Sequence, residues 1–391
     1  MKCNWTTKKL SEIANINPKE SIGKGVVAKK VPMDKLQPFC RDIPEFVLEE
    51  YKGGTKFRNG DTIMARITPC LENGKIAKVS VLSDDEVGFG STEYIVFRAI
   101  DGVSDAEFLY YLICSPLVRN PAIKSMVGSS GRQRVQTDVV ASLNIEIPPF
   151  EEQRKIGGLL KALDDKIELN NQINNNLEQQ AQAIFTNEFL SLETLPDGWK
   201  QASLIDIADY LNGLAMQKYR PSTDETGIPV LKIKELRQGC CDDNSELCSP
   251  NIKSDYIIHD GDVIFSWSGS LLVDFWCGGV CGLNQHLFKV TSAKYDKWFY
   301  YAWTRHHLDR FIAVAADKAT TMGHIKRDEL AKAEVLIPNE KDYNRIGALL
   351  QPIFDLIISN RIENKKLAET RDTLLPKLIS GEVDISEGDY E

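Results

Sequence analysis

The stretch IGGLLKALDDKIELNNQINNNLEQQ at residues 156–180 returns in related form as IGALLQPIFDLIISNRIENKKLAET at residues 346–370. The two copies align without a gap at an offset of 190 residues, so that Ile156 falls on Ile346 and Gly157 on Gly347. This period is far longer than the roughly 20–50 residues of a solenoid repeat. We therefore predict a chain with an internal repeat and approximate (pseudo-) twofold symmetry.

Both copies have the periodicity of a long helix. Counted in heptads from Ile156 and Ile346, the a and d positions are mainly apolar over four heptads, which is typical of a coiled coil. We predict two long helices at 149–192 and 339–380. Pro352 is expected to kink the second helix, because it lacks a backbone donor.

Asparagines interrupt the apolar seam at the same two heptad positions in both copies. If the helices pair in antiparallel fashion, the middle of each faces the middle of the other and the four amides meet. Buried asparagine in a seam lowers stability but fixes register. The alternative leaves these side chains in solvent, and their repetition in both copies favours the seam. The predicted register residues are Asn170, Asn174, Asn360 and Asn364.

Each predicted helix follows a domain of about 150 residues, at 1–148 and 193–338, and an acidic tail at 381–391 ends the chain. The two domains share landmarks such as Trp5 with Trp199, Gly60-Asp61 with Gly261-Asp262, and GSTEYIVFR (90–98) with GLNQHLFKV (282–290). Short alternating runs around the landmarks predict an α+β fold. The loops between them differ, which suggests one frame that carries two different binding surfaces.

Composition limits the class of protein. A chain of 391 residues suits two or three domains, and its net charge of −9 is unusual for a solitary nucleic-acid binder. A local exception is the segment 119–137, which holds four basic residues and no acid. Nine cysteines without a CxxC pair, no signal-like start and no long apolar run predict a cytoplasmic protein with no membrane contact.

We find no motif for catalysis in the sequence. The phosphate loop, HExxH and GxSxG patterns are absent, and IPPF at 147–150 lacks the polar residue that an amino-methyltransferase places before its prolines. Several cysteines and histidines could bind zinc, but their irregular spacing favours no metal site. These ligands are Cys240, Cys241, Cys248, Cys277, Cys281, His259 and His286.

The helical segments IPPFEEQRKIGGLLKALDDKIELNNQINNNLEQQAQAIF (147–185) and LAETRDTLLPKLISGEV (367–383) resemble the helical regions of the specificity subunit of type I restriction–modification enzymes. The resemblance implies two target-recognition domains separated by two long antiparallel helices. Each domain would read one half of a bipartite, asymmetric double-stranded DNA site, and the helices would set the spacer. The subunit would be non-catalytic.

The resemblance also implies partners and their cofactors. Two modification subunits would bind S-adenosylmethionine and methylate adenine at N6, and restriction subunits would use ATP and Mg²⁺ to translocate and cut DNA. No cofactor is expected on this chain. A coiled-coil scaffold or adaptor with two protein- or ligand-binding domains stays open as the alternative, because it would explain the acidic charge equally well.

The base-reading residues are chosen from chemistry, since the resemblance does not fix them. Arginine pairs with guanine O6 and N7, and glutamine with adenine N6 and N7. For any one residue, a phosphate contact or a solvated surface is as open as base readout. The DNA-binding candidates are Arg66, Thr68, Lys75, Ser129, Arg132, Gln133 and Arg134 in the first domain, and Ser266, Trp267, Ser268, Lys318, Thr320, Thr321, His324 and Lys326 in the second.

Overall fold

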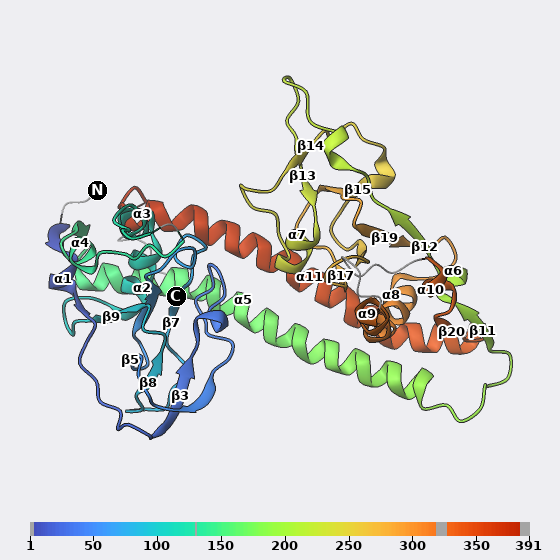
Figure 1. Ribbon diagram of the computed structural model, residues 1–391, viewed down its shortest axis with the longest axis horizontal. Helices are drawn as coiled ribbons and strands as arrows, with labels where there is room; N and C mark the ends of the chain where they lie inside the picture. Colours follow the sequence, from blue (N-terminus) through green and yellow to red (C-terminus); the bar gives the residue numbers. More distant parts are fainter. Residues whose placement is uncertain (1–3, 130, 318–326, 384–391) are drawn as a thin grey trace. The chain divides into compact units, whose positions relative to one another are not determined.

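The computed structural model describes residues 4–129, 131–317 and 327–383. The chain divides into two compact units (Figure 1), and each is described by itself. Unit 1 is Met1–Glu168 with Leu367–Glu391, and unit 2 is Leu169–Lys366. Both units therefore contain segments of the two long helices, α5 (Phe150–Phe185) and α11 (Glu340–Ile379).

Unit 1 contains two four-stranded sheets, in the orders β2-β9-β6-β7 and β4-β3-β8-β5. The first is antiparallel, whereas the second contains one parallel pair, β3 with β8. The strands and short helices are β1 (Thr6–Lys9), α1 (Leu10–Ile13), β2 (Ala14–Ile16), β3 (Val27–Val31), η1 (Met33–Lys35), β4 (Val47–Glu50), β5 (Thr55–Phe57), β6 (Thr62–Ala65), β7 (Ile76–Lys78), β8 (Gly88–Gly90), β9 (Tyr94–Ala99), α2 (Ala106–Cys114), α3 (Pro116–Lys124), α4 (Thr137–Ala141) and β10 (Asn144–Ile147).

Unit 2 repeats this topology with sheets β12-β19-β16-β17 and β14-β13-β18-β15, the second again with one parallel pair, β13 with β18. Its remaining elements are η2 (Thr186–Leu190), β11 (Lys200–Ser203), α6 (Leu204–Ile207), β12 (Asp209–Asn212), η3 (Met216–Lys218), β13 (Ile228–Leu231), α7 (Ile233–Gln238), β14 (Leu247–Cys248), η4 (Ser254–Tyr256), β15 (Ile257–Ile258), β16 (Val263–Ser266), β17 (Leu272–Phe275), β18 (Cys281–Leu283), β19 (Leu287–Thr291), α8 (Lys297–His306), α9 (Leu308–Asp317), α10 (Arg327–Ala331) and β20 (Glu334–Ile337). The predicted α+β fold and internal repeat are confirmed.

The same kind of hydrogen bond, from a tryptophan indole to a carboxylate, joins the domain to its long helix in both units. In unit 1 the Trp5 indole donates a hydrogen bond of 3.1 Å to Glu152, in the first turn of α5. In unit 2 the Trp199 indole donates one of 3.0 Å to Asp342, in the first turn of α11. The paired tryptophans of the sequence are therefore equivalent in structure.

Glycine lets the domain approach each helix closely. A Cβ atom at Gly157 would lie 2.7 Å from the backbone nitrogen of Phe108, near the start of α2. Its counterpart Gly347 leaves room for the Trp298 indole, whose Nε1 would be 3.0 Å from such an atom. Close packing thus explains why glycine occurs at this position of both copies.

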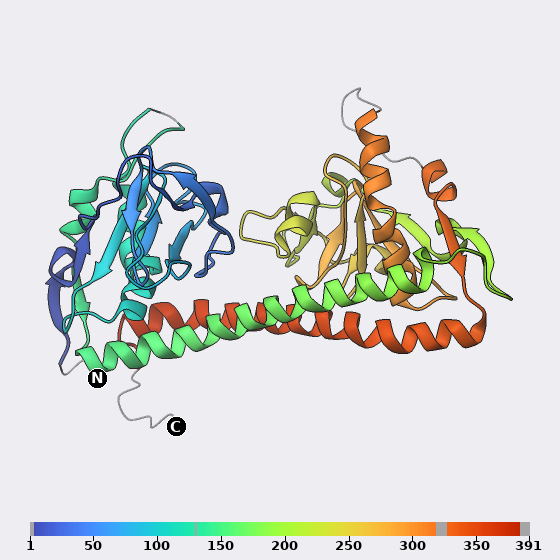
Figure 2. The same ribbon diagram turned by 90° about the horizontal axis from the view of Figure 1, so that it is seen from below.

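The long helices pair in antiparallel fashion inside unit 2 (Figure 2). Asn174 contacts Asn360 there, and Asn170 contacts Asn364. α11 continues as one helix through Pro352, although proline has no N–H to donate to the carbonyl of Ala348. Within the described ranges, none of the helices is long and apolar enough to cross a bilayer.

Candidate nucleic-acid interface

A basic loop of unit 1 pairs through an isolated β-bridge with the segment that follows β6. Val127 and Arg134 exchange two backbone hydrogen bonds, of 3.0 and 2.9 Å, which close the loop into a narrow hairpin. Thr68 N donates to Gln133 O across 3.0 Å, and Val135 N donates to Arg66 O across 2.8 Å. Four of the candidates, Arg66, Thr68, Gln133 and Arg134, are thereby brought together.

Arg134 forms a bidentate ion pair with Glu93, the residue before β9. The guanidinium Nε lies 3.0 and 2.9 Å from the two carboxylate oxygens, and Nη2 lies 2.6 Å from Oε1. The hydrogen bonds from Arg134 lower the pKa of Glu93, which therefore stays ionised. The pair fixes the orientation of an arginine whose side chain remains 47% exposed.

The other unit 1 candidates differ in exposure and in whether their side chains already have hydrogen-bond partners. Arg66 donates from Nη2 to the Val135 carbonyl at 3.3 Å, while its buried Nε has no partner in the described ranges. The Lys75 ammonium is bound to the Met33 carbonyl at 2.8 Å. Ser129 and Arg132 lie exposed on the hairpin.

In unit 2 the candidates surround a turn after β16. Ser266 and Ser268 are buried, and the Ser266 hydroxyl donates to the Ser270 carbonyl at 2.8 Å, so both serines support the turn. Trp267 is half-buried, stacks on Phe288 and donates its indole N–H to Asn212 at 3.0 Å. The candidates Lys318, Thr320, Thr321, His324 and Lys326 lie outside the described residues.

The strand register corrects one alignment made from sequence. Thr62 pairs with Phe97, and Val263 pairs with Val290, whereas matching GSTEYIVFR with GLNQHLFKV would have aligned Phe97 with Lys289. The alignment from sequence relied on matching Gly90 with Gly282, and the hydrogen-bond register shifts this alignment by one residue. Glu93 is therefore equivalent to His286.

Sequence reasoning missed Glu93 and His286 as neighbours of the candidate readers. The His286 ring accepts or donates a hydrogen bond with the Ser268 hydroxyl at 3.1 Å and lies beside Trp267. Neither residue stands out by composition. The internal repeat was the signal that could have identified them, because both residues occupy the third position of the turn before the equivalent strands β9 and β19.

Three of the four seam asparagines are buried in unit 2, and Asn364 is half-buried. Asn360 Nδ2 donates to Asn174 Oδ1 at 2.9 Å, and Asn170 Nδ2 donates to Asn364 Oδ1 at 2.8 Å and to Glu363 at 2.7 Å. Asn170, Asn174 and Asn360 are each less than 9% exposed. The structure thus brings the four predicted residues together, and their role in setting register remains a prediction.

A second seam contact in unit 1 is ionic. Arg371, at a d position of α11, donates to Asp164 on α5 at 2.6 Å, and the Tyr111 hydroxyl donates to the other carboxylate oxygen at 2.6 Å. Both charged side chains are almost fully buried, at 11% and 5% exposure. The charges therefore stabilise the fold only as a pair.

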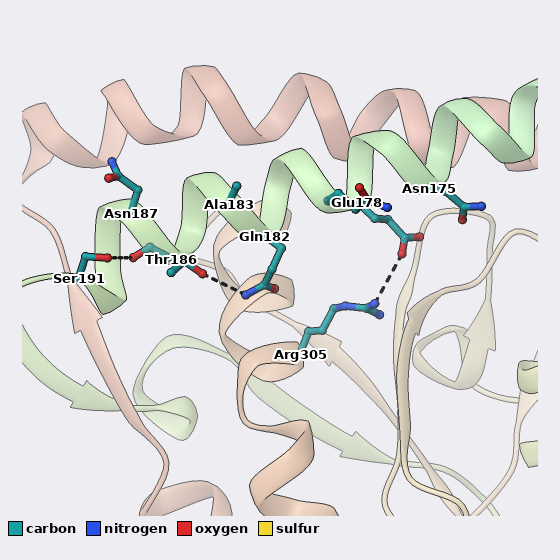
Figure 3. Close-up of a pocket in the computed structure, with 9 residues that line it drawn as sticks. Asn175, Glu178, Gln182, Ala183, Thr186, Asn187, Ser191 and Arg305 are labelled. Carbon is teal, nitrogen blue, oxygen red and sulfur yellow. Dashed lines mark hydrogen bonds and ion pairs between the residues drawn. The ribbon is translucent and has the colours of Figure 1, made fainter.

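A groove of about 880 Å³ lies beside α5 in unit 2 (Figure 3). It is lined mainly by amides and hydroxyls, with Gln182 bonded to Thr186 and Arg305 paired with Glu178 at 3.5 Å. This lining suits hydrogen bonding to a polar surface.

The cysteines weighed as zinc ligands lie in unit 2. Cys241 packs against the apolar cluster that contains Cys281, and burial raises the pKa of Cys277 to about 11. Among the residues that the structure describes, no three His, Cys, Asp or Glu side chains gather closely enough to hold a metal ion.

Comparison with known proteins gives a consistent family. The model of the type I restriction modification DNA specificity domain matches residues 2–179 and again residues 196–369. The specificity subunit of the MjaIX enzyme of Methanocaldococcus jannaschii is 28% identical over 312 residues, covering 73% of this chain and 71% of that protein. The HindI specificity subunit of Haemophilus influenzae is 24% identical over 403 residues, covering 83% and 87%.

Among solved structures, the type I restriction–modification S subunit from M. genitalium has a TM-score of 0.57 with this chain. The match covers 96% of both chains at 13% identity, and so it shows the fold alone. The doubled family match does not favour the scaffold alternative. The chain belongs to the DNA specificity subunits of type I restriction–modification systems, with two specificity domains and a function in DNA sequence recognition.

Proposed function

We propose that each unit binds one half of a bipartite, asymmetric double-stranded DNA site, and that α5 and α11 set the spacer between the halves. The duplicated frame with unlike surfaces carries this proposal. Equivalent positions hold Arg66 and Glu93 in unit 1 but Trp267 and His286 in unit 2. A charged surface and an aromatic surface form different contacts with bases, so two different half-sites are expected.

The chain itself has no catalytic role in this proposal. It assembles with two DNA-adenine methyltransferase (modification) subunits and with restriction or translocase subunits, and these hold S-adenosylmethionine, ATP and Mg²⁺. The long helices provide two related surfaces, because their sequences repeat at an offset of 190 residues. Related surfaces suit two copies of one partner. Partner subunits would also supply positive charge, which offsets the net charge of −9.

Native methylome sequencing tests the proposal. The chain is expressed with its modification subunits in a host that lacks adenine methylation, and we expect N6-methyladenine in one split motif. A hybrid whose segment 1–148 comes from another specificity subunit should change one half of the motif only. The matched hybrid at 193–338 should change the other half. A contiguous motif, or a change in both halves from either hybrid, would contradict the assignment.

A further inference from the structure

Two equivalent turns precede the equivalent strands β9 and β19. In unit 1, Tyr94 N donates to Ser91 O at 3.3 Å and the Ser91 hydroxyl accepts from Glu93 N at 3.1 Å. In unit 2, Leu287 N donates to Asn284 O at 3.0 Å, and the Asn284 side-chain oxygen accepts from His286 N at 3.3 Å. The two turns thus share their backbone bond and their side-chain cap.

The third residue of this turn differs between the units although the turn is the same. Glu93 contacts the arginine of the basic hairpin, whereas His286 contacts a serine and lies beside an aromatic ring. A residue needed only to form the turn would face the same surroundings in both copies. The neighbours of Glu93 and of His286 instead differ, as the candidate DNA-reading residues around them do. This position therefore belongs to the surface that varies between the units.

The ion pair leaves one edge of Arg134 available. Glu93 occupies Nε and one hydrogen of Nη2, and within the described ranges Nη1 makes no hydrogen bond. Arginine reads guanine with two N–H groups directed at O6 and N7. The Nη1–Nη2 edge has that fork geometry, and the bidentate grip of the carboxylate limits its rotation.

We propose that Glu93 is a specificity-determining positioning residue of unit 1, which holds Arg134 in the orientation that reads a guanine of the first half-site. The inference rests on the proposed function. Glu93 does not touch DNA itself and acts through Arg134. Its negative charge also opposes phosphate attraction at the hairpin, so it lowers affinity for unrelated sequences and sharpens discrimination.

Glu93→Gln tests this, because it keeps the size of the side chain and removes the charge. The chain is assembled with its modification subunits, and binding is measured on duplexes with single base changes throughout both half-sites and the spacer. We expect discrimination at one position of the first half-site to fall roughly 5- to 20-fold. Affinity for unrelated DNA should rise, and the second half-site should be unaffected.

Arg134→Gln should relax the same single base pair and lower affinity for unrelated DNA, and this locates the reader. Glu45→Gln is the matched control, since it removes the same charge from an exposed pair with Lys35 in unit 1. It should leave the discrimination at every position unchanged. A purely structural role for Glu93 would instead weaken binding to all sequences alike, without relaxing any one position.

The inference is overturned if Glu93→Gln leaves discrimination intact, or relaxes a position different from that of Arg134→Gln. A uniform loss with Arg134→Gln, equal for every sequence, would identify a phosphate contact and also overturn it. Failure of the proposed function is distinguishable, because the unaltered complex would then show no sequence-selective binding at either half-site.

Discussion

The pair of Asn174 and Asn360 provides a quantitative test of the seam in unit 2. Asn360→Leu removes the donor that lies 2.9 Å from Asn174 Oδ1. An acceptor left buried without a partner costs about 1–3 kcal/mol. A leucine at this buried position returns roughly 1–2 kcal/mol through apolar burial. We therefore expect the single variant to lower the free energy of unfolding by about 1 kcal/mol.

The double variant Asn174→Leu/Asn360→Leu should regain this loss, because neither amide is then left without its partner. Replacing both members of a buried polar pair by apolar residues is often neutral or stabilising. We expect urea unfolding to give a stability at or above that of the natural chain, with a coupling of at least about 1 kcal/mol between the two sites.

Asn176→Leu is the matched control, since Asn176 lies exposed on α5, the helix that also carries Asn174. It should change stability by less than about 0.5 kcal/mol. Losses that simply add in the double variant would refute the reasoning, because the two amides would then not compensate each other. The double variant should also relax the register, which methylome sequencing would detect as more than one spacer length around unchanged half-sites.

Three further predictions concern the helices and the core. Arg371→Met should lower the free energy of unfolding by about 3–5 kcal/mol by leaving Asp164 buried without its partner, and Asp164→Asn in the same chain should restore much of it in urea titrations. Burial lowers the pKa of His307 to about 4, so unfolded chains bind more protons between pH 6.5 and 4 and stability should fall as pH falls through that range. Thermal unfolding should show a flatter dependence for His307→Gln; an unchanged slope would exclude this histidine as the cause. One heptad added to the first helix should alter the spacer or abolish assembly, and a changed half-site sequence would contradict the separate roles of helix and domain.

The helices were accessible from sequence because their information is local and repeated. Heptad spacing predicted both α5 and α11, and the coincidence of asparagines predicted which residues meet in unit 2. The α+β domains were predictable as a class, since a few landmarks recur. Strand register was less accessible, and the shared glycine of Gly90 and Gly282 led to an alignment wrong by one residue.

The candidate interface was only partly predictable, for a physical reason. Arg66 and Arg134 are 68 residues apart in sequence, and only the pairing of the hairpin with the segment that follows β6 brings their backbones together. The acid that holds Arg134 comes from a third segment, the turn at Glu93. Such a cluster depends on non-local hydrogen bonding, which composition and periodicity do not encode. Choosing polar loop residues by type alone therefore selected both arginines and missed the carboxylate that pairs with Arg134.

The glycine and indole contacts at the base of each domain have a consequence for inheritance. At the start of α5 the Trp5 indole bonds to Glu152 and Gly157 packs against Phe108. At the start of α11 the Trp199 indole bonds to Asp342 and Gly347 packs against Trp298, so the two helices begin with matching sockets. A foreign domain that brings its own tryptophan would meet the same socket ahead of either helix. Under the proposed function, genetic exchange at these junctions would provide a route to new specificities, because it would replace one DNA-binding domain and keep both long helices.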